Sequence, residues 1–197
     1  YATLRTARLH GDLPELPKKN GSRCRIHNNK VINNNTLNFG VKGTTVSEIP
    51  AGTGIIVMAT NQCNIFNNEI SGHNSVSTAI VSFMAINKPF KDSIYDPYCG
   101  GIYFHDNKIT RGTGSVDQSV VFGKLFTAMF GDQVPDVITD GAVNPAYRNT
   151  DGSIKDDQKI CIRNNGHITF SNMDLLDKGK HKNSDISKFD CTQSPIN

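Results

Sequence analysis

The sequence predicts an all-β fold of stacked turns, a right-handed parallel β-helix, and three observations lead to this prediction. A nine-residue unit occurs four times, each unit alternates apolar and variable positions, and each carries an Asn-Asn or Asp-Asn pair. Self-similarity of this kind is typical of proteins that stack one structural unit on the next. The units are CRIHNNKVI (24–32), CNIFNNEIS (63–71), IYFHDNKIT (102–110) and ICIRNNGHI (160–168).

The apolar residue before each polar pair aligns the units, which are then 39, 39 and 58 residues apart. The alternation before the pair predicts a strand with one buried face. The pair itself predicts a bend, because Asn tolerates the left-handed backbone conformation. The aligned residues are Ile26, Ile65, Phe104 and Ile162, and the strand is expected to resume at Val31, Ile70, Ile109 and Ile168.

A second apolar strand precedes three of the units, at 54–59, 78–85 and 135–141. Each turn of the chain therefore holds about three short strands, and successive turns are expected to stack about 4.8 Å apart. A β-sandwich is the alternative fold, but its strands would not repeat their sequence in register.

Stacking places equivalent residues of successive turns in columns. One inward column is apolar, and another holds the second residue of each polar pair. An amide column satisfies its own donors and acceptors, which explains these Asn residues without any function. The two columns are Cys24, Cys63, Ile102, Ile160 and Asn29, Asn68, Asn107, Asn165.

The chain divides into an irregular N-terminal segment (1–20), the stacked turns (21–173) and a C-terminal strap or cap (174–197). We expect further turns before residue 1, because an open turn exposes a sheet edge. Long excursions interrupt the turns, and the third contains a short helix near 122–130. Insertions of this kind often form the binding face of a solenoid. The excursions are 41–52, 86–101 and 111–134, with a polar loop at 144–158.

Composition argues against two classes of partner. The 197 residues carry a net charge of +3, and the Lys and Arg residues are scattered, so the sequence does not favour nucleic acid. No apolar stretch is long enough to span a membrane. The 21 Asn residues lie within a regular apolar pattern, which favours turns of a folded array over low complexity.

Five cysteines permit two disulfides and one free thiol. Cys24 and Cys63 share one inward column, so they either form a disulfide or stack as core thiols. Cys161 is one residue out of that column and faces outward, where we expect a disulfide with Cys191 that clamps the tail onto the last turn. Export would permit this bond. Cys99 has no evident partner.

Beyond the repeat itself, five segments point to a known family: DLPELPKKNGSRCRIHNNKVINNNTLNFG, IPAGTGIIVMATNQCNIFNNEIS, YDPYCGGIYFHDNKIT, PDVITDG and KICIRNNG. They resemble a bacterial family of exported parallel β-helix repeat proteins. The resemblance covers about residues 12–192 and includes the segments between the turns. It implies the fold, a lipoprotein-type export signal, a location in the periplasm, on the outer membrane or outside the cell, and a di-haem cytochrome-like partner; it supplies no catalytic residues.

Outward-facing residues are the candidates for function, because the inward columns are explained by packing. A flat stacked face suits a long polymer, and cleavage of an acidic polysaccharide needs a cation, a base and an acid around the sugar ring. The catalytic candidates are Tyr103, His105, Lys108 and Arg111. The ligand-binding candidates are His27, Phe66, His105, Arg163, Tyr95 and Tyr98.

Metal binding has little support in the sequence. His27 and His105 lie two turns apart, about 10 Å, whereas zinc ligands must converge on one ion. We therefore expect no metal site and no cofactor, with calcium at Asp92 and Asp96 as the one alternative.

The remaining charged residues are interpreted structurally. Lys30, Glu69 and Lys108 predict a solvated charge ladder on adjacent turns. Asp136 and Asp140 are too far apart for a glycosidase pair, so they are interpreted as strand-end residues.

The sequence thus predicts an exported scaffold that binds an extended ligand, either a polysaccharide or a cell-envelope protein, along its stacked face. A polysaccharide lyase or related carbohydrate-active enzyme is the first alternative. A structural partner of an envelope redox protein is the second, and it rests on the family resemblance alone.

Overall fold

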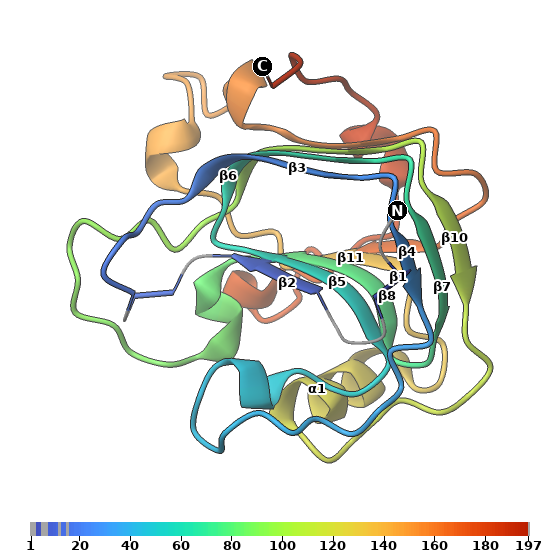
Figure 1. The fold of residues 1–197 in the computed structure, drawn as a ribbon. Coiled ribbons are helices and arrows are strands. Elements are labelled where there is room, and N and C mark those ends of the chain that lie inside the picture. Colours follow the sequence, from blue (N-terminus) through green and yellow to red (C-terminus); the bar gives the residue numbers. More distant parts are fainter. Residues whose placement is uncertain (1–2, 5–7, 12, 15, 197) are drawn as a thin grey trace.

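The computed structural model describes residues 3–4, 8–11, 13–14 and 16–196. The described chain is mostly β, with three parallel sheets and an α-helix, α1 (Val121–Phe130) (Figure 1). None of the described helices has the length and apolar character needed to cross a membrane.

We name the three sheets A, B and C, and every strand pair within them is parallel. Sheet A holds β1 (Thr3–Leu4), β4 (Lys30–Ile32), β7 (Glu69–His73) and β10 (Lys108–Arg111). Sheet B holds β2 (Arg8–Gly11), β5 (Thr53–Met58), β8 (Val76–Val81), β11 (Val137–Thr139) and β13 (Phe170–Asn172). Sheet C holds β3 (Ser22–His27), β6 (Asn61–Phe66), β9 (Gly100–His105) and β12 (Ile160–Arg163).

The chain visits the sheets in a repeating order. From β2 to β12 it passes from B to C to A and back to B, so each strand pairs with its equivalent one turn away. Figure 1 shows sheet C along the top, sheet B through the middle and sheet A on the right. The segment 1–20 also contributes strands to two of the sheets, β1 to sheet A and β2 to sheet B.

Strand pairing confirms the register predicted from the repeat. Cys24 pairs with Cys63, Cys63 with Ile102, and Ile102 with Ile160. The column of Ile26, Ile65, Phe104 and Ile162 follows the same register. The fourth unit stays aligned although 58 residues separate it from the third, because the additional residues form the loop at 144–158 and other connections outside the ladder.

The predicted bend and amide ladder are also confirmed. The first residue of each polar pair has a positive φ, between 52° and 55°. The second residue donates its side-chain N–H to the amide oxygen of the next turn at 3.0, 2.9 and 3.0 Å. The residues with positive φ are Asn28, Asn67, Asp106 and Asn164, and the ladder is Asn29, Asn68, Asn107 and Asn165.

The fourth unit departs from the prediction after its bend. Ile168 was expected to resume the strand, but residues 164–169 form no strand and the chain next pairs as β13 with β11 in sheet B. Gly166 has a φ of 72°, which turns the chain away from the path of the earlier units. Ile168 still packs partly buried against the interior cluster.

Strands β5, β8 and β11 of sheet B are buried on both faces, and alternate residues of β5 enter two different apolar clusters. Ile55 and Val57 join the interior cluster between the three sheets, together with Ile65 and Ile70. Ile56 and Met58 belong to the cluster on the other face, which includes Phe122 and Phe126 of α1. Figure 1 shows α1 on the side of sheet B that is away from sheet C.

The excursions therefore cover sheet B. The first contains a short 3-10 helix (Val46–Glu48), and Ile49 beyond it joins the outer cluster with Phe83 and Tyr95. The predicted helix near 122–130 is present as α1. The face of sheet C is covered instead by part of the C-terminal tail, whose described 3-10 helices are Leu175–Asp177 and Ile186–Phe189.

Candidate ligand-binding face

Three rings stack at the carboxyl ends of three neighbouring strands of sheet C. His27, Phe66 and His105 end β3, β6 and β9, so the register brings them face to face. The ring centroids of His27 and Phe66 are 4.8 Å apart with an interplanar angle of 12°. Those of Phe66 and His105 are 5.3 Å apart at 5°. We call these three residues the ring column.

A second set of side chains widens this face. The Tyr103 ring stacks on His105 with centroids 3.8 Å apart, because the two residues are on the same side of β9. The guanidinium carbon of Arg25 lies 5.7 Å from the centroid of Phe66, in the range of a cation–π contact. These stacked rings and the Arg25 guanidinium together form a partly exposed surface, which we call the platform.

Two neighbouring side chains hold the His105 ring in place. Its Nδ1 is 2.6 Å from the Asp106 carboxylate and its Nε2 is 2.9 Å from the Asn64 amide oxygen. Asn64 comes from the neighbouring strand and Asp106 from the bend. The imidazole is therefore fixed between Tyr103 and Phe66 by hydrogen bonds at both nitrogens.

A groove of about 490 Å³ lies beside the platform. Its floor is formed by the middle columns of sheet C, including Gln62, Asn64 and Tyr103, with Arg23 at one side. One wall is the tail at 192–196, and Asp156 and Asp157 belong to the other. The groove thus offers amides, a phenol, a guanidinium and two carboxylates to a polar ligand.

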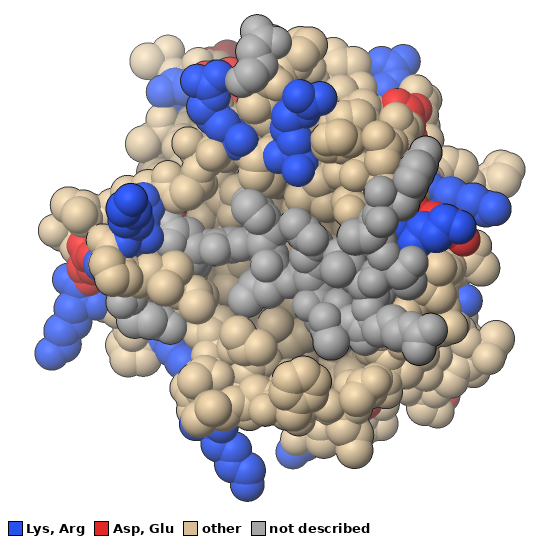
Figure 2. Space-filling model, viewed as in Figure 1, with Lys and Arg blue, Asp and Glu red and all other residues tan. Residues whose placement is uncertain are grey.

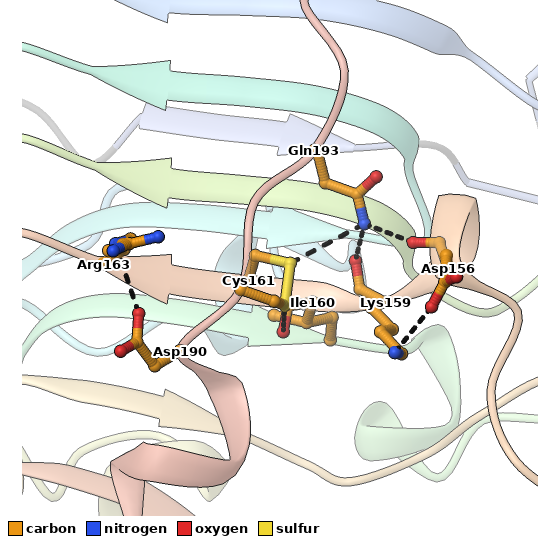
Figure 3. The surroundings of a disulfide bond; sticks show 8 residues. Asp156, Lys159, Ile160, Cys161, Arg163, Asp190 and Gln193 are labelled. Atoms are coloured by element: carbon orange, nitrogen blue, oxygen red, sulfur yellow. Dashed lines mark hydrogen bonds and ion pairs between the residues drawn. A yellow bond between two sulfur atoms is a disulfide. The ribbon is translucent and has the colours of Figure 1, made fainter.

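The tail is fixed over sheet C at two points, which Figure 3 shows. A disulfide joins Cys191 to Cys161 in β12, the pair expected from the sequence, with Cα atoms 4.9 Å apart. The Gln193 amide donates to the backbone oxygens of Asp156 at 2.8 Å and Lys159 at 2.9 Å. Cys161 faces outward in register, yet the tail leaves it fully buried.

The other cysteines are part of the interior. Cys24 and Cys63 form a disulfide between adjacent turns, with Cα atoms 4.6 Å apart, which resolves the two alternatives left by the sequence. Cys99 is free and buried, and its thiol donates to the Val81 carbonyl at 3.2 Å. Burial raises the pKa of Cys99 to about 12, so it is held as a neutral thiol.

The four catalytic candidates do not come together. Tyr103 and His105 lie in sheet C, whereas Lys108 and Arg111 follow the bend and belong to β10 in sheet A. Arg111 donates to the Asn74 carbonyl at 3.3 Å, and burial lowers the pKa of its guanidinium. Sequence proximity placed the four side chains together, but the bend turns the second pair onto another sheet.

One of the two ligand-binding candidates from the excursion, Tyr95, is also corrected. Tyr95 is 4% exposed, and its ring packs edge-on against Phe83 and Phe90 with centroids 5.7 and 5.3 Å away. It therefore belongs to the core beside sheet B rather than to the stacked face. Tyr98 is partly exposed, and its N–H donates to Asp96.

Charged candidates take part in ion pairs. Arg163 continues the ring column opposite His105 and pairs with Asp190 at 3.4 Å. In the charge ladder, Lys30 and Lys108 both lie opposite Glu69, and the Lys30–Glu69 distance is 3.5 Å. Figure 2 shows the Lys and Arg residues dispersed over the described part of one face of the molecule.

The acids considered for calcium have protein partners. Asp92 pairs with Lys19, and Asp96 accepts hydrogen bonds from Tyr147 and from Asn144. These contacts use the carboxylate oxygens that a calcium ion would need.

The two acids that flank β11 are strand-end residues, as the sequence indicated. Asp140 is buried and accepts hydrogen bonds from the N–H and hydroxyl of Ser82, and burial raises its pKa. Asp136 accepts from the hydroxyl and N–H of Thr169.

One cluster was missed by the sequence analysis. Asp174, Asp177 and His181 bring one ligand atom each within 4.8 Å of one another, on the exposed tail. The spacing D-x-x-D-x-x-x-H was the available signal. Exposed Lys178, Lys180 and Lys182 interleave with these residues in the sequence.

Comparison of the chain with family models, curated proteins and solved structures gives no match. The geometry described above therefore carries the functional argument by itself.

Proposed function

We propose that this chain folds as an exported right-handed parallel β-helix. The repeating order of the three sheets and the four-residue amide ladder support the stacked-turn architecture. Two disulfides are compatible with an oxidising compartment, where such bonds persist.

We further propose that the face of sheet C binds an extended polysaccharide. The ring column is the observation that carries this proposal, because the stacked rings present their edges as a row that repeats once per turn, against which the apolar faces of successive sugar units can pack. The adjoining groove supplies amide, guanidinium and carboxylate groups for sugar hydroxyls. An envelope protein is the other class of extended partner, and it would use the same face.

Binding to soluble polysaccharides by affinity electrophoresis tests this proposal. We expect one or more members of a panel of neutral and acidic polysaccharides to retard the protein. Phe66→Ala should weaken that retardation about tenfold, since it removes the apolar ring edge at the centre of the row and the support that this ring gives to His27 and His105. Phe39→Ala is the matched control, because Phe39 is 82% exposed on a loop outside sheet C.

Two results would contradict polysaccharide binding on this face. One is the absence of retardation across the whole panel. The other is an equal loss of binding in the Phe66 and Phe39 variants. If the protein bound immobilised cell-envelope proteins but no polysaccharide, and Phe66→Ala abolished that binding, a protein partner would be favoured.

A second candidate function is a polysaccharide lyase, which the contact between Tyr103 and His105 favours. His105, held by Asp106, would take the proton from C5 of a uronate, and the Tyr103 hydroxyl would give its proton to the departing glycosidic oxygen. A lyase should generate ultraviolet-absorbing unsaturated uronate from alginate or pectate, and Tyr103→Phe should abolish the product while leaving binding intact. Binding without product from any uronate polymer rules this activity out for the polymers tested.

A further inference from the structure

A second cavity, of about 360 Å³, lies at the corner where sheet B passes into sheet C. Thr139 and Asn172 reach it from the ends of β11 and β13, and Ile160 from the start of β12. The loop around Arg148 and the tail near Phe189 close it from the sides. We call this space the corner cavity; none of the described residues around it belongs to the ring column.

The mouth of the corner cavity is cationic. Arg148, Lys159 and Lys188 line it, and among the described lining residues there is no Asp or Glu. Lys159 is partly neutralised by Asp156, 2.7 Å away, a pair that Figure 3 shows. Arg148 uses one guanidinium nitrogen to donate to the Gly152 carbonyl at 2.7 Å, which leaves its other N–H groups available for an anion.

The interior of the cavity is largely apolar. Ile154, Ile160 and Phe189 contribute hydrocarbon and aromatic surface, and Cys99 lies at its wall as a neutral thiol. A space of this size accommodates a single-ring molecule, and its lining resembles that of small-molecule sites, which combine apolar walls with a few polar groups.

Asn183 adds an unused acceptor to this wall. Its Oδ1 atom is buried and accepts no hydrogen bond from the described residues, while its amide N–H donates to the His181 carbonyl. A buried acceptor without a donor is unfavourable, so a ligand hydroxyl or N–H at this point would be favoured.

We propose that the corner cavity binds a small amphipathic organic acid that carries a hydroxyl group. The carboxylate lies at the mouth between Arg148 and Lys188, and an aromatic or aliphatic body packs against Ile160 and Phe189. The hydroxyl donates to Asn183 Oδ1. This site is separate from the polysaccharide face and does not depend on it.

Isothermal titration calorimetry of the full chain with three matched compounds tests the proposal. The compounds are 3-(4-hydroxyphenyl)propanoate, its uncharged primary amide, and 3-phenylpropanoate, which lacks the hydroxyl. We expect one site for the hydroxy acid and about tenfold weaker binding of each analogue, because each lacks one polar contact.

Charge-reversed variants test whether the acid binds in the corner cavity. Lys188→Glu should weaken binding of the hydroxy acid about tenfold, whereas Lys180→Glu should change it little, because Lys180 is exposed on the same tail and does not line the cavity. Phe66→Ala, which disrupts the ring column, should leave the affinity for this acid unchanged.

Three outcomes would overturn the proposal: no heat of binding at millimolar acid, equal affinity for the acid and its amide, or equal effects of the Lys188 and Lys180 variants. Loss of binding on Phe66→Ala would move the acid to the polysaccharide face and also overturn it. Since the two proposals use different ligands and expect opposite effects of Phe66→Ala, either one can fail while the other stands.

Discussion

Asn68 illustrates how much of the fold depends on single amides. Its side-chain N–H groups donate to Asn107 and to the carbonyls of Ile26 and Phe66, and its oxygen accepts from Asn29. It is 2% exposed, so water cannot replace these partners. The amide therefore joins three successive turns through hydrogen bonds that alternative side chains cannot reproduce.

Asn68→Ala should be more destabilising than Asn29→Ala. Asn68 has described partners on both sides, and its loss leaves buried carbonyls without donors at about 1–3 kcal/mol for each group. Asn29 is half-exposed, and water can satisfy the partners that its removal frees. Urea denaturation measures both costs; equal losses would show that the ladder contributes no more than a surface hydrogen bond.

His73 is a buried residue of sheet A with both ring nitrogens used. Nδ1 accepts from the Asn34 N–H at 3.3 Å, so Nε2 carries the proton and donates to the Val31 carbonyl at 3.0 Å. Burial lowers the pKa of His73, although the bond to Val31 opposes this shift. The folded protein therefore holds the imidazole in its neutral form.

Stability should consequently fall in mild acid. The unfolded chain takes up a proton below about pH 6.5, whereas folded His73 does so only at lower pH, so the contribution of His73 is complete above pH 6.5 and is lost as pH falls through the folded pKa. His73→Gln should lower stability at neutral pH and flatten this dependence between about pH 7 and about pH 5. Exposed His167→Gln is the control; an unchanged slope in His73→Gln would assign the acid sensitivity to other groups.

At the scale of elements, the tail and the bends determine which residues share a surface. The periodic strands could be predicted because their neighbours one turn away carry the same pattern of letters. The contacts of the tail could not be predicted, because residues 192–196, which lie beside Asp156 and Gln62, are not part of any sequence repeat. Tyr95 was misplaced for the same reason: its burial depends on Phe83 and Phe90 in a segment without periodicity.

Removing the Cys161–Cys191 bond tests what the tail contributes. The double variant Cys161→Ser, Cys191→Ser should lower the free energy of unfolding by about 3–4 kcal/mol, the chain-entropy value for a loop of this length. It should also make the tail sensitive to protease beyond Phe189. Asp190→Asn, which removes the exposed pair with Arg163, should cost at most about 1 kcal/mol; equal effects would mean that the disulfide adds nothing beyond that ion pair.

At the scale of the whole molecule, the three sheets have different exposures. Sheet B is covered by α1 and the excursions, and sheet C carries the ring column and the groove. The residues of the ring column could be predicted from the sequence repeat. Which sheet the insertions would cover could not, because the length of an insertion does not determine the direction in which the loop folds back. The part of sheet C that the tail leaves uncovered, around the ring column and the groove, is thus the face on which ligand contacts can be made.

The amide ladder also exposes the molecule to chemical ageing. Asn165 is followed by Gly166, the pair in which a side-chain amide is most readily hydrolysed through a cyclic imide, and its N–H groups donate to the carbonyls of Phe104 and Arg163. Closure of the imide would require both hydrogen bonds to break, so the fold protects this amide for as long as the last turn stays closed. After hydrolysis the side chain at this position would be a carboxylate, which cannot donate a hydrogen bond to those two carbonyls. A single brief opening of the last turn could therefore destabilise it permanently.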